Sequence, residues 1–148
     1  MSGIMMQLLG TAGGPSVAAG VVAQTIIGSD RTNNWGRSVA MSEDGSTIAF
    51  GNYTEPYGYS YGRVFVYVRG SGDTWSSQAT ITISSSINAR SGNSIALSGN
   101  GNTLVIGKYY NNNNSGRVYV YTRSGTSWSE AADFDGSNTG SGDEFGSN

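Results

Sequence analysis

The stretch 62–69 reads GRVFVYVR, and the stretch 116–123 reads GRVYVYTR. Side chains alternate between the two faces of a strand, so each stretch predicts one β-branched face and one aromatic face with arginines at its ends. In the first stretch the two faces are Val64, Val66 and Val68 on one side and Arg63, Phe65, Tyr67 and Arg69 on the other. Both faces need cover, which predicts a sheet stacked between neighbouring sheets.

The two stretches are parts of a longer repeat. WGRSVAMSEDGSTIAFG, which begins at Trp35, returns as SGNSIALSGNGNTLVIG from Ser91, and Trp75 aligns with Trp128. Each copy holds four strand candidates, joined by Gly, Asn and Asp turns of the kind that connect antiparallel strands. Those of the first copy are 37–42, 46–50, 62–69 and 74–84. A strand-built repeat of this length is typical of propeller blades. We therefore predict an all-β chain of four-stranded antiparallel, propeller-like blade repeats with an N-terminal extended arm.

The predicted division of the chain follows the repeat. It comprises an apolar, Gly-rich anchoring arm (1–33), a first β repeat (34–90), a second β repeat (91–144) and the start of a third (145–148). The arm has no charge before Asp30, and it lacks the basic start of a secretory signal and the uninterrupted apolar run of a membrane span. The alternative is a first strand behind a disordered lead-in. The arm residues expected to mediate assembly are Ile4, Met5, Met6, Leu8 and Leu9.

The amino-acid composition argues against several classes of function. The net charge of −2 argues against a nucleic-acid partner, and the chain has no His and no Cys. The commonest general base, the commonest metal ligand and any disulfide framework are therefore missing. The 10 acidic residues are scattered. We expect neither catalysis nor a cofactor.

The recurring segments resemble the FG-GAP-type repeats of β-propeller proteins, which are related to those of integrin α-subunit heads and are abundant in bacterial surface and phage proteins. The matching segments are WGRSVAMSEDGSTIAFG, GRVFVYVR and TWSSQ, then SGNSIALSGNGNTLVIG, GRVYVYTR and SWSE, and together they span about residues 35–148. Calcium-bearing members carry an Asp-rich loop, but the turns at 42–45 and 98–101 hold two carboxylates or fewer, so no metal site is expected. Similar propellers have about seven blades, within the usual range. Two copies cannot close a ring, which leaves an oligomer, a longer polypeptide or an open stack of sheets as alternatives.

These features predict a structural component of an extracellular or virion appendage, such as a phage fibre, spike or capsid-decorating protein. The opening MSGIMMQLLG resembles the starts of structural proteins of marine cyanophages. The expected partners are other virion or appendage proteins and further copies of this chain, and the expected location is the virion or the extracellular surface.

The alternative is a carbohydrate-binding, lectin-like β-propeller module for adhesion to surface glycans. Such sites place an aromatic platform beside amides and hydroxyls. The candidate ligand loops supply Tyr57, Tyr59, Tyr61, Tyr109, Tyr110 and Asn112. Trp75 and Trp128 recur at a fixed strand position, which favours blade packing over sugar binding for both.

Overall fold

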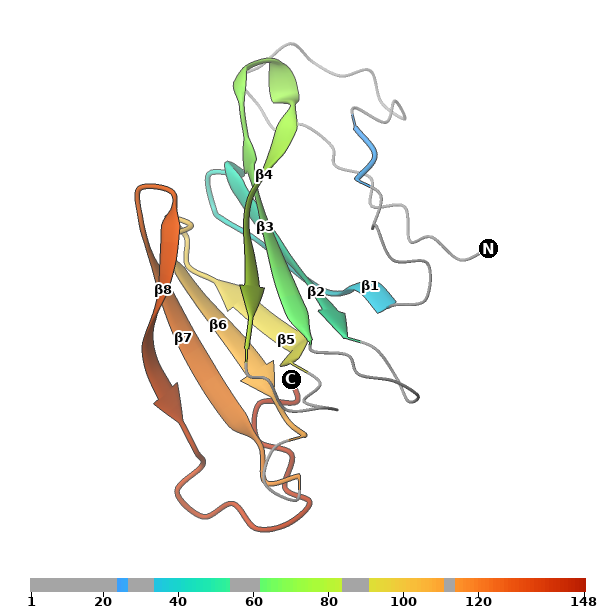
Figure 1. Ribbon diagram of the computed structural model, residues 1–148, viewed down its shortest axis with the longest axis vertical. Coiled ribbons are helices and arrows are strands. Elements are labelled where there is room, and N and C mark those ends of the chain that lie inside the picture. Colours follow the sequence, from blue (N-terminus) through green and yellow to red (C-terminus); the bar gives the residue numbers. More distant parts are fainter. Residues whose placement is uncertain (1–23, 27–33, 54–61, 84–90, 111–113) are drawn as a thin grey trace.

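The computed structural model describes residues 24–26, 34–53, 62–83, 91–110 and 114–148, which form two four-stranded antiparallel sheets (Figure 1). The first sheet contains β1 (Asn34–Met41), β2 (Thr47–Tyr53), β3 (Arg63–Arg69) and β4 (Trp75–Thr82) in that spatial order. The second contains β5 (Ser91–Leu97), β6 (Thr103–Lys108), β7 (Arg117–Ser124) and β8 (Ser127–Phe134). A 3-10 turn, η1 (Ser71–Asp73), joins β3 to β4. The all-β, four-stranded antiparallel prediction is confirmed.

The turns between the first two strands of each sheet close as the sequence predicts. In the first sheet the Gly45 amide donates to the Ser42 carbonyl (2.9 Å), and the Asp44 carboxylate accepts from the Ser42 hydroxyl (2.6 Å). In the second sheet Gly101 donates to the Ser98 carbonyl (2.8 Å). Both glycines have positive φ, which glycine adopts without steric cost. Each turn fixes the register of the two strands that it joins, β1 with β2 and β5 with β6.

The main core lies between the two sheets. Val64 and Val66 of β3 are fully buried and point toward the second sheet, where Leu104 and Ile106 of β6 are equally buried. Alternation along β3 therefore places its valines at the sheet interface, as the period of two predicts. Removing this apolar surface from water stabilises the pair of sheets together.

The opposite face of the first sheet is aromatic. Trp35 stacks on Phe65 with ring centroids 4.1 Å apart, and Phe50 lies against both Phe65 and Tyr67. Opposite residues in an antiparallel pair point to the same face, and the register pairs Phe50 with Phe65. The predicted division into a β-branched face and an aromatic face is confirmed.

Candidate assembly interface

The two sheets contact one another through different faces. We call the face of each sheet that carries the aromatic residues of its third strand, β3 or β7, the leading face, and the face that carries the valines of that strand the trailing face. The leading face carries Ile48, Phe50, Phe65 and Tyr67 in the first sheet and Leu104, Ile106, Tyr119 and Tyr121 in the second. The trailing face carries Ala49, Val64, Val66 and Ile81 in the first sheet and Val105, Val118, Val120 and Phe134 in the second. The trailing face of the first sheet packs on the leading face of the second.

A glycine-lined slot at the lower end of the first sheet holds the start of β5. The slot consists of Gly51 and Gly62, and a Cβ on either would overlap the backbone of residues 91–92. The inserted Gly92 has φ +84°, and its carbonyl accepts a hydrogen bond from the Ser38 hydroxyl (2.7 Å). Only glycines permit this close approach of backbone to backbone.

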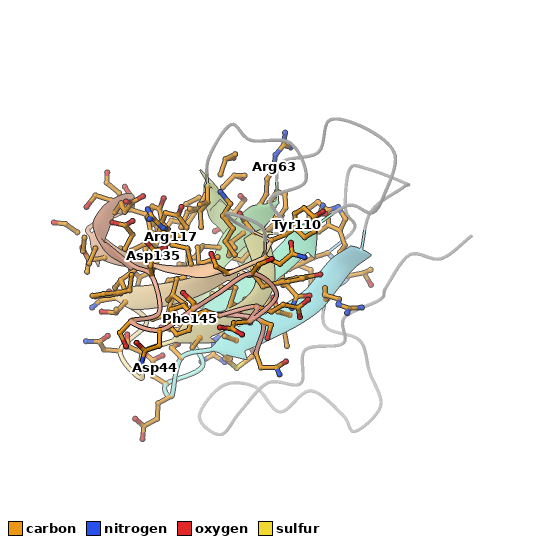
Figure 2. The ribbon with its side chains drawn as sticks, turned by 90° about the horizontal axis from the view of Figure 1, so that it is seen from below. Asp44, Arg63, Tyr110, Arg117, Asp135 and Phe145 are labelled. Atoms are coloured by element: carbon orange, nitrogen blue, oxygen red, sulfur yellow. The ribbon has the colours of Figure 1, made fainter. Side chains whose placement is uncertain are left out.

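The second sheet has the same slot, formed by Gly107 and Gly116. Residues 145–147 fill it, because a Cβ on Gly107 would overlap the Gly146 carbonyl and one on Gly116 would overlap the Phe145 backbone. Gly146 has φ +81°, and its carbonyl accepts from the Ser94 hydroxyl (2.7 Å), as Gly92 does from Ser38. Figure 2, viewed from below, shows Phe145 at this lower end of the molecule. The slots leave no signal in the sequence beyond the alignment of Gly51 with Gly107 in the repeat.

A polar clasp joins the sheets at their upper outer corner. Gln78, a bulged residue of β4, accepts hydrogen bonds from the Trp128 indole (3.1 Å) and from Arg123 (3.2 Å) of the second sheet. The Arg123 guanidinium also lies over the Trp128 ring, 5.5 Å from its centroid. Trp128 therefore contributes to packing between the sheets, as its fixed position in the repeat predicts.

Residues 24–26 cover Trp75, which occupies the position in the first sheet that Trp128 occupies in the second. The Gln24 side-chain amide bonds both the amide (2.6 Å) and the carbonyl (3.0 Å) of Trp75, and Ile26 packs on Ile48 and Trp75. Trp75 is only 8% exposed as a result. Gln24 thus pairs with the backbone of β4, an edge strand, in the manner of a neighbouring strand.

Several charged groups lie at the lower end of the second sheet. Arg117 donates to Asp135 (2.7 Å from Nε) and also pairs with Asp133, and the first two residues lie side by side in Figure 2. The hydrogen bond from Arg117 holds the pKa of Asp135 below its usual value. Burial, with the nearby Arg117 charge, lowers the pKa of Lys108. Toward the other end of β7, burial raises the pKa of Tyr121 to about 12, and its bond to Glu130 acts in the same direction. The pairs of Arg117 with Asp133 and Asp135 are those of a structural ion-pair cluster.

Only two of the predicted ligand-loop residues can be placed. Tyr109 is buried, whereas Tyr110 is 42% exposed beyond the end of β6. Tyr57, Tyr59, Tyr61 and Asn112, together with the arm residues Ile4, Met5, Met6, Leu8 and Leu9, lie outside the described residues. Among the residues that the structure describes, no cluster of acidic side chains could hold a metal ion. In the same part of the chain no helix is long and apolar enough to cross a bilayer.

The outer sides of the two sheets expose apolar side chains whose counterparts in the other sheet are covered at the interface between the sheets. Val39 and Met41 of β1, on the leading face of the first sheet, are 53% and 44% exposed. Their counterparts on β5 are packed against the core. On the trailing face of the second sheet Phe134 is 53% exposed, whereas Ile81 at the same position of the first sheet is 6% exposed. The exposed apolar surface of the first sheet is therefore confined to β1, since Ile48 and Phe50 on the same face are buried.

Sequence comparison identifies an FG-GAP repeat at residues 75–121. This segment runs from Trp75 at the start of β4 to Tyr121 in β7, so it includes the outer strand of the first sheet and three strands of the second. No curated protein matches the sequence significantly. An FG-GAP repeat indicates a β-propeller-like protein, and such repeats are typical of extracellular or surface proteins, often adhesive ones.

Proposed function

We propose that this protein is a structural component of an extracellular or virion appendage, such as a phage fibre, spike or capsid-decorating protein. The observation that carries the proposal is that the two sheets stack through one apolar interface while Val39 and Met41 of β1 and Phe134 of β8 stay exposed on the outer sides. Repeat sheets bury their apolar faces by stacking, so apolar side chains left exposed on both outer sides favour a protein that works by assembling.

The role proposed is not catalytic. The chain has no His and no Cys, and the acidic residues nearest to one another in the second sheet, Asp133 and Asp135, are both paired with Arg117. The hydrogen bond from Arg117 lowers the pKa of Asp135, which makes this carboxylate a poor proton acceptor. These features support a role in binding and construction.

Fractionation of the producing host tests the proposal. The full chain should be recovered with particles or with the cell surface, and deletion of residues 1–23 should abolish that recovery while preserving the β signal in circular dichroism. This deletion retains Gln24 and its hydrogen bonds to the backbone of Trp75. A matched variant changes only Ile4, Met5, Met6, Leu8 and Leu9 to Ser. Recovery of the full chain only in the cytosolic fraction would contradict the proposal.

A carbohydrate-binding module for adhesion is the second candidate. The exposed ring of Tyr110 at the loop end of the second sheet favours it, because aromatic rings stack on sugars. A glycan array should then show binding by the full chain that Tyr110→Ala abolishes. The buried neighbour gives the control, since Tyr109→Phe keeps the ring and should leave binding unchanged. An array without signal above background removes this candidate.

A further inference from the structure

The charged residues of the second sheet are divided unevenly between its two faces. Within the described strands β5–β8, the register places all of them on the leading face: Lys108, Arg117, Arg123, Glu130 and Asp133. The trailing face of these strands carries small, hydroxyl-bearing or apolar side chains. A solvated sheet face is usually polar, whereas depletion of charge marks the centre of a protein interface. The trailing face of the second sheet therefore has the chemistry of a covered surface.

The middle of this face repeats a row of side chains that is covered in the first sheet. Cross-strand pairing aligns Ala96, Val105, Val120 and Ala132 in the second sheet. The same row of the first sheet consists of Ala40, Ala49, Val66 and Ala79. There Ala49 and Val66 are fully buried against the second sheet, whereas in the second sheet Ala96 is exposed. The small side chains of this row let an opposing sheet approach to the usual packing distance.

The hydroxyl groups on this face are compatible with burial. Thr103 pairs with Thr122, and Thr122 pairs with Ser129, in the row next to the apolar one. Thr47 is the counterpart of Thr103 in the first sheet, and it is buried there beneath the turn of the second sheet at Gly101. A threonine in this row therefore tolerates a facing sheet.

Phe134 projects from the outer strand of the same face. It pairs with Val118 and is 53% exposed. Residues 145–147 lie over the lower end of the face, since a Cβ on Gly107 would overlap the Gly146 carbonyl and a Cβ on Gly146 would lie 2.9 Å from Val118. The open part of the face thus extends from Phe134 through the apolar row to the threonines.

We propose that the trailing face of the second sheet binds the same face of a second copy of this chain, in an isologous dimer. This inference rests on the proposed function and names a partner and a surface for assembly. The lack of charge favours a second copy as the occupant. A two-fold contact sets a face against itself, so charges near the axis would meet their like, and this face has none in its strands.

The position of residues 145–147 selects the orientation of the two copies. A two-fold axis along the strands would place both of these segments at the same end of the interface and hold the sheets apart there. An axis across the strands sets the lower end of each face over the upper end of the other. Phe134 of each copy then packs on Ala132 and Ser129 of the other, as an aromatic anchor over small side chains. The contact closes on itself, so the product is a dimer and no filament forms through it.

Two substitutions on opposite outer sides of the molecule test the contact. Phe134→Asp removes the anchor and buries a charge in an apolar contact, so it should weaken self-association of the full chain at least about tenfold. Met41→Asp makes the same kind of change on β1, where Met41 is 44% exposed, and should leave association unchanged. Light scattering over a concentration series measures both, with circular dichroism to verify the fold of each variant.

Cross-linking tests the geometry of the dimer, because the chain has no Cys and each introduced thiol is unique. Ala132→Cys lies in the central row of the face, and a short bismaleimide reagent should join it to the same residue of a second copy. Asp133→Cys is the matched control, since the next residue along β8 points to the leading face and should remain unlinked.

Four results would each overturn the trailing-face contact. They are a full chain that stays monomeric at every concentration, association that survives Phe134→Asp or is lost in Met41→Asp, species larger than a dimer, and equal cross-linking of the two Cys variants, including none in either. Host fractionation decides the appendage role separately, so recovery of the chain at the surface together with any of these results would remove the dimer alone.

Discussion

The two sheets share one plan, yet the same position in each meets a different environment. Ile81 on the trailing face of the first sheet is buried against the second sheet, whereas Phe134 at that position of the second sheet is exposed. Val64 and Val66 are buried in the same way, and their counterparts Val118 and Val120 are half-buried. The burial of a residue in this repeat is therefore set by the neighbouring sheet, because each repeat covers only the next.

The largest difference in the free energy of unfolding is expected between substitutions at Ile81 and at Phe134, which occupy the same position on the two trailing faces. Ile81→Ala should destabilise the chain by about 2–5 kcal/mol because it opens a cavity in the core, while Phe134→Ala should change stability by about 0.5 kcal/mol or less. Urea unfolding at the lowest workable protein concentration measures both. A similar loss in the two variants would mean that the trailing face of the second sheet is covered in solution.

The next largest difference in stability is expected between the two glycine slots. Gly51→Ala should cost about 3 kcal/mol, because the inserted Gly92 begins a strand and cannot leave the slot, whereas Gly107→Ala should cost about 1 kcal/mol by expelling residues 145–147. Thermal unfolding with both variants in one buffer checks the order. If Gly107→Ala proved the more damaging, residues 145–147 would be an integral part of the second sheet.

The polar clasp should have a smaller effect. Gln78→Ala removes the acceptor for Trp128 and Arg123 and should cost about 1 kcal/mol, as for a typical part-buried hydrogen bond. Gln78→Glu keeps an oxygen at that position and should retain most of the stability. Chemical unfolding followed by tryptophan fluorescence reports the change, and an unaltered midpoint in Gln78→Ala would show that the clasp is not stabilising.

The smallest expected effect concerns the two turns. Hydrogen bonds from Ser42 and then from Ser46 lower the pKa of Asp44 to about 2, from an ordinary value of 3.8, so its contribution is present above pH 3.8 and is lost as the pH falls toward 2. Asn100 serves the second turn without a titrating group. Asp44→Asn should therefore reduce the fall in thermal midpoint between pH 5 and about pH 2.5. An equal fall in the wild type and the variant would assign the acid sensitivity elsewhere, with Asp135→Asn as the comparison.

The strands and their faces were predictable because short-range chemistry decides them. Alternation in GRVFVYVR predicts a valine face and an aromatic face, and the turn glycines 45 and 101 predict the hairpins. The slots were not predicted, since a close approach of two backbones leaves no periodic signal beyond the repeated glycines. The clasp was missed for a related reason: Gln78 and Trp128 are 50 residues apart.

The sequence by itself determined the repeat, the four strands of each copy and which side chains share a face, because these depend on spacing of two residues and on local turn geometry. Only the tertiary structure decided that the trailing face of the first sheet packs on the leading face of the second, and that the glycine slots hold the start of β5 and residues 145–147. Such contacts join parts of the chain that are distant in sequence, and their energy comes from surfaces that exist only after the sheets have formed.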